Sequence, residues 1–180
     1  MIPAIEVRHL HYTYPDGKKA LTGINLQVAE GESVGLIGPN GSGKSTLLLH
    51  LNGVLPERLN STPNVFVFGK GLTTENLPTI RRDVGLLFQD PDDQLFCPTV
   101  FEDVAFGPQQ FGIPDARIKE VVRQSLSRVG LDGMGERSPH HLSGGEKQRV
   151  CLAGILACNS RVLALDEPSS NLDLYRYGND

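Results

Sequence analysis

A glycine-rich loop constrains this chain more than any other stretch. It lies between two apolar runs, at residues 33–37 and 47–51, and reads Gly38-Pro39-Asn40-Gly41-Ser42-Gly43-Lys44-Ser45-Thr46. Glycines let consecutive backbone N–H groups turn inward without a Cβ in the way, and a helix starting near Lys44 adds the positive end of its dipole. The spacing, G-x4-G-K-[ST], therefore predicts a phosphate cradle between a strand and a helix.

The side chains at the end of this loop suit the same task. Lys44 is expected to reach the β- and γ-phosphates of a nucleotide as a point charge. The Ser45 hydroxyl is expected to hold a Mg²⁺ ion that bridges the same oxygens. An ordinary glycine turn is the alternative interpretation, and the strand-loop-helix context favours the phosphate site.

Composition limits the classes of partner and compartment. The 180 residues are enough for one domain with a sizeable core, and a net charge of −4 provides no basic footprint for nucleic acid. The N-terminus lacks a signal-peptide pattern, and no apolar stretch approaches the length of a bilayer span, which predicts a cytosolic product. The three cysteines are not spaced as zinc ligands and are interpreted as reduced thiols. No chemistry is assigned to the five histidines.

Hydrophobic periodicity predicts the strands. Residues 5–7 and 24–28 alternate apolar and polar side chains on either side of a Pro-Asp-Gly-Lys turn at 15–18, which predicts a hairpin. Residues 65–68 are expected to join the same antiparallel sheet. Continuously apolar runs predict three fully buried strands, at 34–37, 84–88 and 162–165.

Three helices are predicted from spacing and end signals. The first runs from the glycine loop to about Asn52, with Gly53 as its C-terminal glycine. The second is amphipathic, begins at Pro114-Asp115 and ends before Gly130. The third begins near Ser143 and is apolar on almost every side over residues 150–157. Prolines at 91, 98, 108 and 114 are expected to break the intervening stretch into short pieces of an inserted lobe.

Polar residues follow two of the predicted buried strands. Gln89 ends one strand, Asp166 and Glu167 end another, and a third strand leads into the phosphate loop. In an open parallel sheet these residues would meet at one carboxyl edge. Asp166 would then lie near Mg²⁺, and Glu167 could polarise an attacking water.

The run Leu142-Ser143-Gly144-Gly145-Glu146-Lys147-Gln148 resembles the signature motif of ATP-binding cassette (ABC) ATPases. The family's other motifs follow the same order along the chain, and the resemblance covers essentially all of it. They are the adenine-stacking aromatic at Tyr14 (Tyr12 fits less well by spacing), Walker A at 38–46, the Q-loop glutamine at Gln89, Walker B with the catalytic glutamate at 163–167, and the D-loop Ser170-Asn171-Leu172-Asp173.

The resemblance implies an α/β fold. It is a P-loop NTPase core with a mainly parallel sheet, an N-terminal antiparallel β-subdomain and an inserted helical subdomain. Residues 1–180 would be a single, incomplete domain, with the core and β part at 1–89 and 160–180 and the helical part at 90–159. Family members continue through another core strand to a switch histidine, and no histidine follows His141. Weak hydrolysis or none is therefore expected of this chain alone.

The resemblance also implies cofactors and roles for the motif residues. ATP and Mg²⁺ are the implied cofactors, with Glu167, Lys44 and Gln89 catalytic and Ser45, Gln89 and Asp166 around the metal. The residues implied to bind ATP are Tyr14, Gly38, Pro39, Asn40, Gly41, Ser42, Gly43, Lys44, Ser45 and Thr46. Ser143, Gly144, Gly145 and Glu146 would contact the nucleotide of a second copy or a paralogue in a head-to-tail dimer, in which Asp173 marks the D-loop. A plain serine helix cap is the local alternative for Ser143.

Residues 88–107 resemble the Q-loop region of cobalt, nickel and energy-coupling-factor importer ATPases. In that subfamily this region receives a coupling helix of an integral membrane subunit, and a solvated acidic turn is the alternative for Asp92 and Asp93. The resemblance implies an ATP-hydrolysing importer subunit for a metal ion (cobalt or nickel) or a vitamin, peripheral on the cytoplasmic face of the membrane. Alternatives are a truncated, impaired remnant and a soluble non-transport ABC ATPase.

Overall fold

The computed structural model describes residues 2–59 and 62–168, and the chain divides into two compact units with the boundary after Leu86. Each unit has its own hydrophobic interior and is described by itself. The first carries the N-terminal strands and the phosphate loop, and the second carries the helical part and the predicted signature segment.

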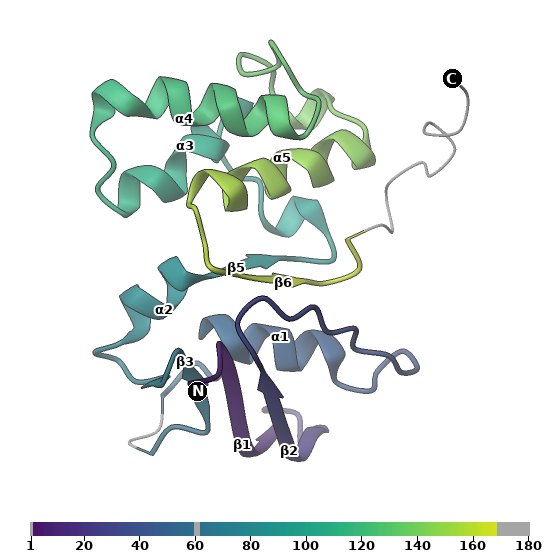
Figure 1. Ribbon diagram of the computed structural model, residues 1–180. Coiled ribbons are helices and arrows are strands. Elements are labelled where there is room, and N and C mark those ends of the chain that lie inside the picture. Colours follow the sequence, from purple (N-terminus) through teal and green to yellow (C-terminus); the bar gives the residue numbers. More distant parts are fainter. Residues whose placement is uncertain (1, 60–61, 169–180) are drawn as a thin grey trace. The chain divides into compact units, whose positions relative to one another are not determined.

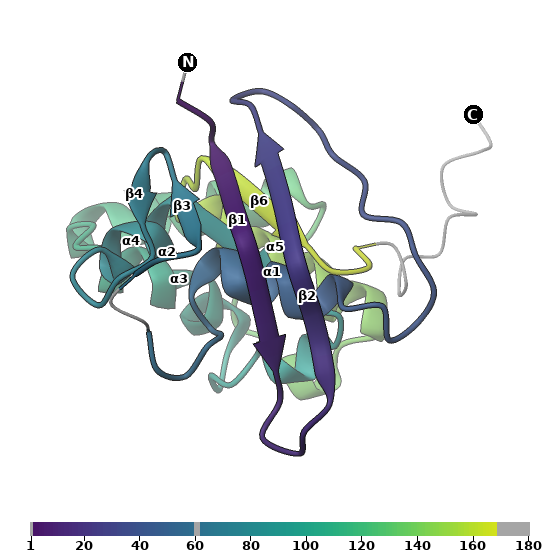
Figure 2. The same cartoon turned by 90° about the horizontal axis from the view of Figure 1, so that it is seen from below.

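The first unit contains a four-stranded antiparallel sheet with the order β2-β1-β3-β4. Its long hairpin is plain in Figure 2. Ile5 is central to the register, because it pairs with Val28 on one side and Val67 on the other. The predicted hairpin and its extra strand are therefore confirmed. The strands are β1 (Ile5–Thr13), β2 (Lys19–Val28), β3 (Val65–Val67) and β4 (Lys70–Gly71).

Two helices complete this unit, α1 (Lys44–Asn52) and α2 (Leu77–Asp83). Helix α1 ends as its sequence predicts, at Gly53 in the left-handed conformation with φ 73°. A Cβ on Gly53 would lie 2.5 Å from Cδ1 of Leu77, so a larger residue here would also have to displace that leucine side chain. The apolar side chains of α1 that are buried are Leu47, Leu48 and Leu51.

The predicted buried strand at residues 34–37 is not present in the structure. Residues 33–40 have no regular secondary structure, and the side chain of Ile37 is 98% exposed. An apolar run becomes a buried strand only where neighbouring strands bond to its backbone. Neither of the described sheets includes this run, so its hydrophobicity alone does not order it as a strand.

The second sheet pairs β5 (Val84–Leu87) with β6 (Val162–Leu165). The backbone N–H of Asp166 donates to the carbonyl of Leu87 at 3.1 Å, so both strands end at the same edge and run parallel. The strand at 162–165 is confirmed, but its full burial is wrong, because Leu163 is 47% exposed. A strand is buried on both faces only where other elements pack on both, and the described residues do not cover the face that carries Leu163.

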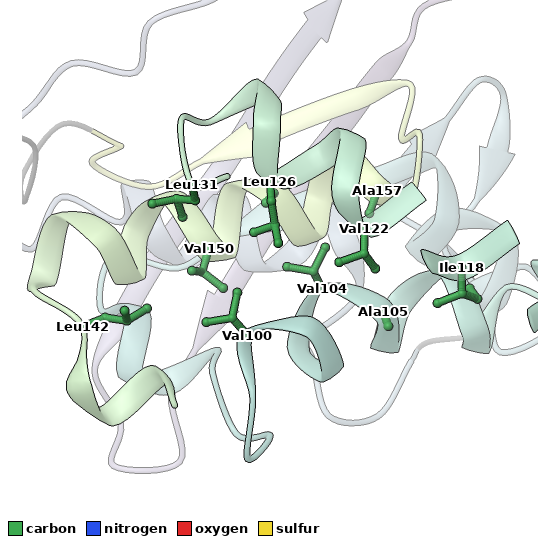
Figure 3. Close-up of a cluster of buried hydrophobic side chains, with 11 residues drawn as sticks. Val100, Val104, Ala105, Ile118, Val122, Leu126, Leu131, Leu142, Val150 and Ala157 are labelled. Atoms are coloured by element: carbon green, nitrogen blue, oxygen red, sulfur yellow. The ribbon is translucent and has the colours of Figure 1, made fainter. Parts of the chain in front are cut away.

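Three helices pack around a shared hydrophobic core in the second unit: α3 (Val100–Gln110), α4 (Asp115–Arg128) and α5 (Gly144–Ala157). Figure 3 shows their apolar side chains converging between the helices. A short 3₁₀ helix, η1 (Pro91–Asp93), precedes α3, and another, η2 (Pro139–His141), lies between α4 and α5. The packing of the three α-helices is visible in Figure 1. The buried core residues are Val100, Val104, Ala105, Ile118, Val122, Leu126, Leu131, Leu142, Val150, Ala153 and Ala157.

Helix α3 contradicts the expectation that prolines break this stretch into short pieces. The helix begins with a capping box, in which Thr99 Oγ1 accepts from the N–H of Glu102 at 3.2 Å. Pro108 lies within the last turn and is buried. A proline inside a helix costs about 3 kcal/mol, whereas burying two valines returns about 1.5–3 kcal/mol each. The burial of Val100 and Val104 therefore outweighs the proline.

Helix α4 follows the predicted amphipathic pattern and ends before Gly130, as expected. Its start differs in detail, because Pro114 is the N-cap residue and no side chain caps the helix there. Asp115 instead lies in the first turn, where its negative charge interacts favourably with the positive end of the helix dipole. Among the described residues, no helix combines the length and apolar content that crossing a bilayer takes.

Truncating Leu126 tests the core between the three helices. Leu126→Ala is expected to lower the free energy of unfolding by about 2–5 kcal/mol, because it removes buried methyl groups and leaves a cavity. Urea titration followed by circular dichroism measures the loss. Lys119→Ala, on the exposed face of the same helix, is the control and should change stability by less than about 0.5 kcal/mol. Equal losses in the two variants would contradict the assigned core.

Candidate functional site

The phosphate loop passes close against the hairpin at Gly43, the N-cap of α1. Gly43 has φ 93°, and a Cβ there would lie 2.6 Å from the carbonyl oxygen of Ala20. A Cβ on Gly38 would lie 2.8 Å from Oγ of Ser42. The contact at Gly43 is with backbone, so glycine is required there for space and for positive φ, whereas at Gly38 the Ser42 hydroxyl would have to turn away.

Lys44 lies against the inner side of this loop. Its Nζ donates to the carbonyl oxygens of Gly38 and Pro39 at 3.0 and 3.1 Å, which draws the ammonium group into the turn. The first turn of α1 holds no acidic side chain, so its positive dipole end is not neutralised locally. A cationic side chain beside an uncompensated helix N-terminus forms a site for an anion such as a phosphate group.

Tyr14, the predicted base-stacking residue, contacts the same helix. Its hydroxyl is 2.9 Å from Oγ1 of Thr46, the last residue of the phosphate loop. The Thr46 carbonyl is 2.7 Å from Nδ1 of His50, and burial lowers the pKa of that histidine. The sequence singled out Tyr14 and Thr46 separately, but nothing in their spacing predicted that they touch.

Gln89, Asp166 and Glu167 lie together at the carboxyl ends of β5 and β6. Gln89 Nε2 donates to Glu167 Oε2 at 3.1 Å. Asp166 is buried, with 9% exposure, whereas Gln89 and Glu167 are exposed. Glu167 also has a positive φ of 46°, an uncommon conformation for a residue other than glycine. The structure therefore brings these three predicted residues to one edge.

The chemistry of these donors fits a magnesium ion. Gln89 uses its amide N–H for Glu167, which leaves its carbonyl oxygen available as an acceptor, and Asp166 contributes a carboxylate at the end of β6. Amide, carboxylate and hydroxyl oxygens are the ligands that Mg²⁺ prefers, together with water and phosphate. Across residues 2–59 and 62–168, no group of three or more His, Cys, Asp or Glu side chains gathers as a metal site.

The predicted signature segment begins helix α5 with a complete capping box. Ser143 Oγ accepts from the Glu146 N–H at 3.3 Å, and the Glu146 carboxylate accepts from both the N–H and the hydroxyl of Ser143 at 2.8 Å. These bonds lower the pKa of Glu146. The serine cap that the sequence left as an alternative is present, and the Ser143 hydroxyl donates within its own helix. Any anion at this N-terminus would compete with Glu146 for that proton.

An ion pair joins the segment after Gln89 to the signature helix. Lys147 Nζ lies 2.6 Å from Asp92 Oδ1, and Cys151 Sγ donates to the carbonyl of Pro91 at 3.9 Å. Asp92 is therefore partnered within the chain, whereas Asp93 is an exposed residue of the same turn. The sequence identified Lys147 only as part of the predicted signature segment. It did not predict the contact with Asp92, which lies 55 positions away along the chain.

Two aromatic rings form an exposed pair on the second unit. The rings of Phe96 and Phe106 meet edge to face with centroids 5.0 Å apart, although their side chains are 67% and 44% exposed. The sequence did not predict this pair, because the stretch that contains Phe106 was expected to form short irregular pieces between prolines and not a helix. Exposed aromatic residues gathered in one place are typical of a contact surface.

The remaining predictions concern cysteines and the D-loop. Cys97, Cys151 and Cys158 are free thiols, and burial raises the pKa of Cys151 to about 12 and that of Cys158 to about 11. The predicted D-loop, including Asp173, lies outside the described residues.

The phosphate loop belongs to the first unit, and the strand ends and signature helix belong to the second.

Comparison with known proteins gives a consistent match. The family model described as ABC transporter matches residues 21–170. The energy-coupling factor transporter ATP-binding protein EcfA of Methanothermobacter thermautotrophicus is 53% identical over 171 residues, which are 94% of this chain and 54% of that protein. The chain thus spans about half the length of this curated relative.

Solved structures match the fold. CbiO1 from Clostridium perfringens, described as part of the ABC transporter complex CbiONQ, is 37% identical with a TM-score of 0.78, covering 96% of this chain and 68% of that one. The ATP-binding cassette MJ0796, solved as a dimer bound to ADP and Pi, is 28% identical with a TM-score of 0.82, covering 94% and 76%. The fold is therefore that of an ABC-type P-loop ATPase, as the sequence predicted.

The capping box at Ser143 gives a pH-dependent prediction. Because the folded-state pKa of Glu146 lies below its ordinary value of 4.5, its stabilising effect is present above that value and is lost as the pH falls through the folded pKa. Glu146→Gln should therefore lower stability at pH 7, and its difference from wild type should shrink toward pH 3.

Chemical unfolding at a series of pH values measures this difference. Glu75→Gln, at an exposed turn, is the control and should show no such pH dependence of its effect. A stability difference for Glu146→Gln that is the same at both ends of the pH range would contradict the assigned interaction.

Proposed function

Because the chain belongs to the ABC transporter family, we propose that it is the ATP-binding and ATP-hydrolysing part of an importer subunit. In this role it couples ATP binding and hydrolysis to uptake through a separate membrane subunit. The observation that carries the proposal is the phosphate loop, in which Gly43 brings the backbone against the hairpin and Lys44 lies at the open N-terminus of α1. The relatives support a transporter subunit, since EcfA is named as an energy-coupling factor transporter ATP-binding protein and CbiO1 as part of an ABC transporter complex.

The nucleotide is held by residues of the first unit. Lys44 neutralises phosphate charge, the loop amides and the start of α1 donate to phosphate oxygens, and Tyr14 stacks on the adenine ring. The loop residues that form the cradle are Gly38, Pro39, Asn40, Gly41, Ser42, Gly43, Lys44, Ser45 and Thr46. MJ0796 supports the ligand class, because it was solved with ADP and Pi.

Hydrolysis requires a base and a metal ion. Glu167 accepts a proton from the attacking water, and the bond from Gln89 Nε2 orients its carboxylate. Ser45, Gln89 and Asp166 would be the residues that hold Mg²⁺, each through a side-chain oxygen. When bound, Mg²⁺ neutralises charge that develops on the phosphate oxygens. A positioned general base contributes about 10²- to 10⁴-fold to a rate.

A second copy of the chain or a paralogous ATPase completes each nucleotide site. Ser143, Gly144, Gly145 and Glu146 at the start of α5 meet the phosphate held by the partner in a head-to-tail dimer. Ser143 and Gly144 are exposed at a helix N-terminus, which suits an anion. MJ0796 supports the arrangement, since it was solved as a dimer.

The membrane subunit contacts the exposed Phe96 and Phe106 pair, which follows Gln89 along the chain. Large aromatic rings supply most of the binding energy at interfaces, and the exposed carboxylate of Asp93 adds attraction for a basic residue of the partner. This contact places the protein on the cytoplasmic face of the membrane. The transported substrate is a cobalt or nickel ion or a vitamin, recognised by another subunit.

Replacing Lys44 tests the nucleotide site. Lys44→Ala is expected to weaken Mg-ATP binding at least tenfold, because it removes a charged hydrogen bond worth about 1.5–3 kcal/mol. Isothermal titration calorimetry with Mg-ATP measures the affinity. Lys18→Ala, in the exposed hairpin turn, is the control and should bind like wild type. Unchanged affinity in Lys44→Ala would refute the phosphate site.

Replacing Phe96 tests the membrane contact. Tagged protein expressed in its source cells is expected to sediment with membranes, and Phe96→Ser should move it to the supernatant because the aromatic anchor is lost. Ile2→Ser, at a residue of equal exposure (66%), is the control and should leave the distribution unchanged. Membrane association that survives both Phe96→Ser and Phe106→Ser would place the contact elsewhere.

A further inference from the structure

Four residues of the first unit form a closed ring of contacts between the hairpin and the phosphate-loop helix. The Tyr14 hydroxyl is 2.9 Å from Thr46 Oγ1, and the Thr46 carbonyl is 2.7 Å from His50 Nδ1. The His50 ring packs edge to face on Tyr12 with centroids 4.7 Å apart, and Tyr12 packs on Tyr14 at 5.0 Å. The ring links the proposed base platform directly to the loop that holds phosphate.

The sequence spacing explains why the ring closes. Tyr12 lies in β1 and Tyr14 follows the last residue of that strand, and their rings meet on one side of the hairpin. Thr46 and His50 are four residues apart in α1, so they lie one above the other. The two tyrosines of the hairpin therefore face the Thr46 and His50 pair of α1, with Tyr14 on Thr46 and Tyr12 on His50.

Burial makes the hydrogen bonds of the ring necessary. Thr46 is 6% exposed and His50 is 1% exposed. A buried hydroxyl without a partner costs about 1–3 kcal/mol, and Tyr14 supplies that partner. Because burial disfavours the charged form of His50, its neutral ring carries the proton on Nδ1 and donates to the Thr46 carbonyl.

The direction of the Tyr14 bond decides what Thr46 can do. A threonine hydroxyl has one proton and two lone pairs. If the phenol of Tyr14 donates, Thr46 accepts on a lone pair and keeps its own proton for another acceptor. That proton lies on the first turn of α1, where no acidic side chain competes for it.

We propose that Tyr14 is a positioning residue for the phosphate of the nucleotide, in addition to stacking on its base. Its hydroxyl donates to Thr46 Oγ1, and the Thr46 hydroxyl is thereby oriented to donate to a phosphate oxygen. The proposal rests on the proposed ATP-binding function and adds to it a bond that couples base recognition to phosphate recognition. Tyr12 and His50 hold this pair in place from the opposite side of the ring.

Tyr14→Phe tests the proposal, because it keeps the aromatic ring and removes only the hydroxyl. Loss of one hydrogen bond, worth about 0.5–1.5 kcal/mol, should weaken Mg-ATP and Mg-ADP binding about two- to tenfold. Binding of adenosine, which has no phosphate, should stay unchanged. Calorimetry with ATP and ADP and competition by adenosine measure these affinities. Thr22→Val, which removes a hydroxyl from an exposed residue of β2, is the control and should bind all three like wild type.

A double-mutant cycle with Thr46 identifies the route of the effect. In a Thr46→Val background, Tyr14→Phe should cause no further loss, whereas in Thr46→Ser, which keeps a hydroxyl, it should act as in wild type. Equal ATP affinity of Tyr14→Phe and wild type overturns the proposal, as does an equal loss for adenosine. Unfolding of Tyr14→Phe without nucleotide also overturns it, since the bond is then structural.

Lys44→Ala separates this proposal from the proposed function. If Lys44→Ala leaves ATP affinity unchanged, the phosphate site itself is wrong. If Lys44→Ala abolishes binding and Tyr14→Phe has no effect, the ATP site holds and only the positioning role fails.

Discussion

The approach of the Gly43 backbone to the Ala20 carbonyl is the contact on which the proposed site depends. A side chain at Gly43 would collide with the hairpin, and its positive φ starts α1 at Lys44 with an open N-terminus. The same approach brings α1 near enough to the hairpin for Tyr14 to bond to Thr46. One glycine therefore sets the helix start, the lysine position and the link to the base platform.

The second unit positions its polar residues in a different way, through strand pairing. The bond from the Asp166 N–H to the Leu87 carbonyl aligns the ends of β5 and β6, so Gln89 and Glu167 reach each other across two strands. Side chains that leave neighbouring strands at the same level need no special loop to meet. This is why the residues after two short apolar runs could be grouped from the sequence.

The sequence predicted best where the signal is local. Glycine at 53 ended α1, and the turn at 15–18 joined the hairpin, because backbone preferences at these positions are strong. It failed at residues 34–37, because a strand depends on partners that its own residues do not reveal. It failed at Pro108 because the burial that compensates a proline comes from other helices. Contacts such as Tyr14 with Thr46, 32 positions apart, have no local signal at all.

The contacts of η1 connect the two interfaces proposed for the second unit. Lys147 follows the signature residues on α5, and its bond to Asp92 fixes the turn that leads to Phe96. An exposed ion pair alone stabilises by at most about 1 kcal/mol. Here the Lys147 side chain is 17% exposed and that of Asp92 is 66% exposed, and the Cys151 thiol donates a further hydrogen bond to the Pro91 carbonyl. Because an ion pair and a thiol hydrogen bond both hold η1 to α5, the turn that leads to Phe96 is fixed to the signature helix at two points.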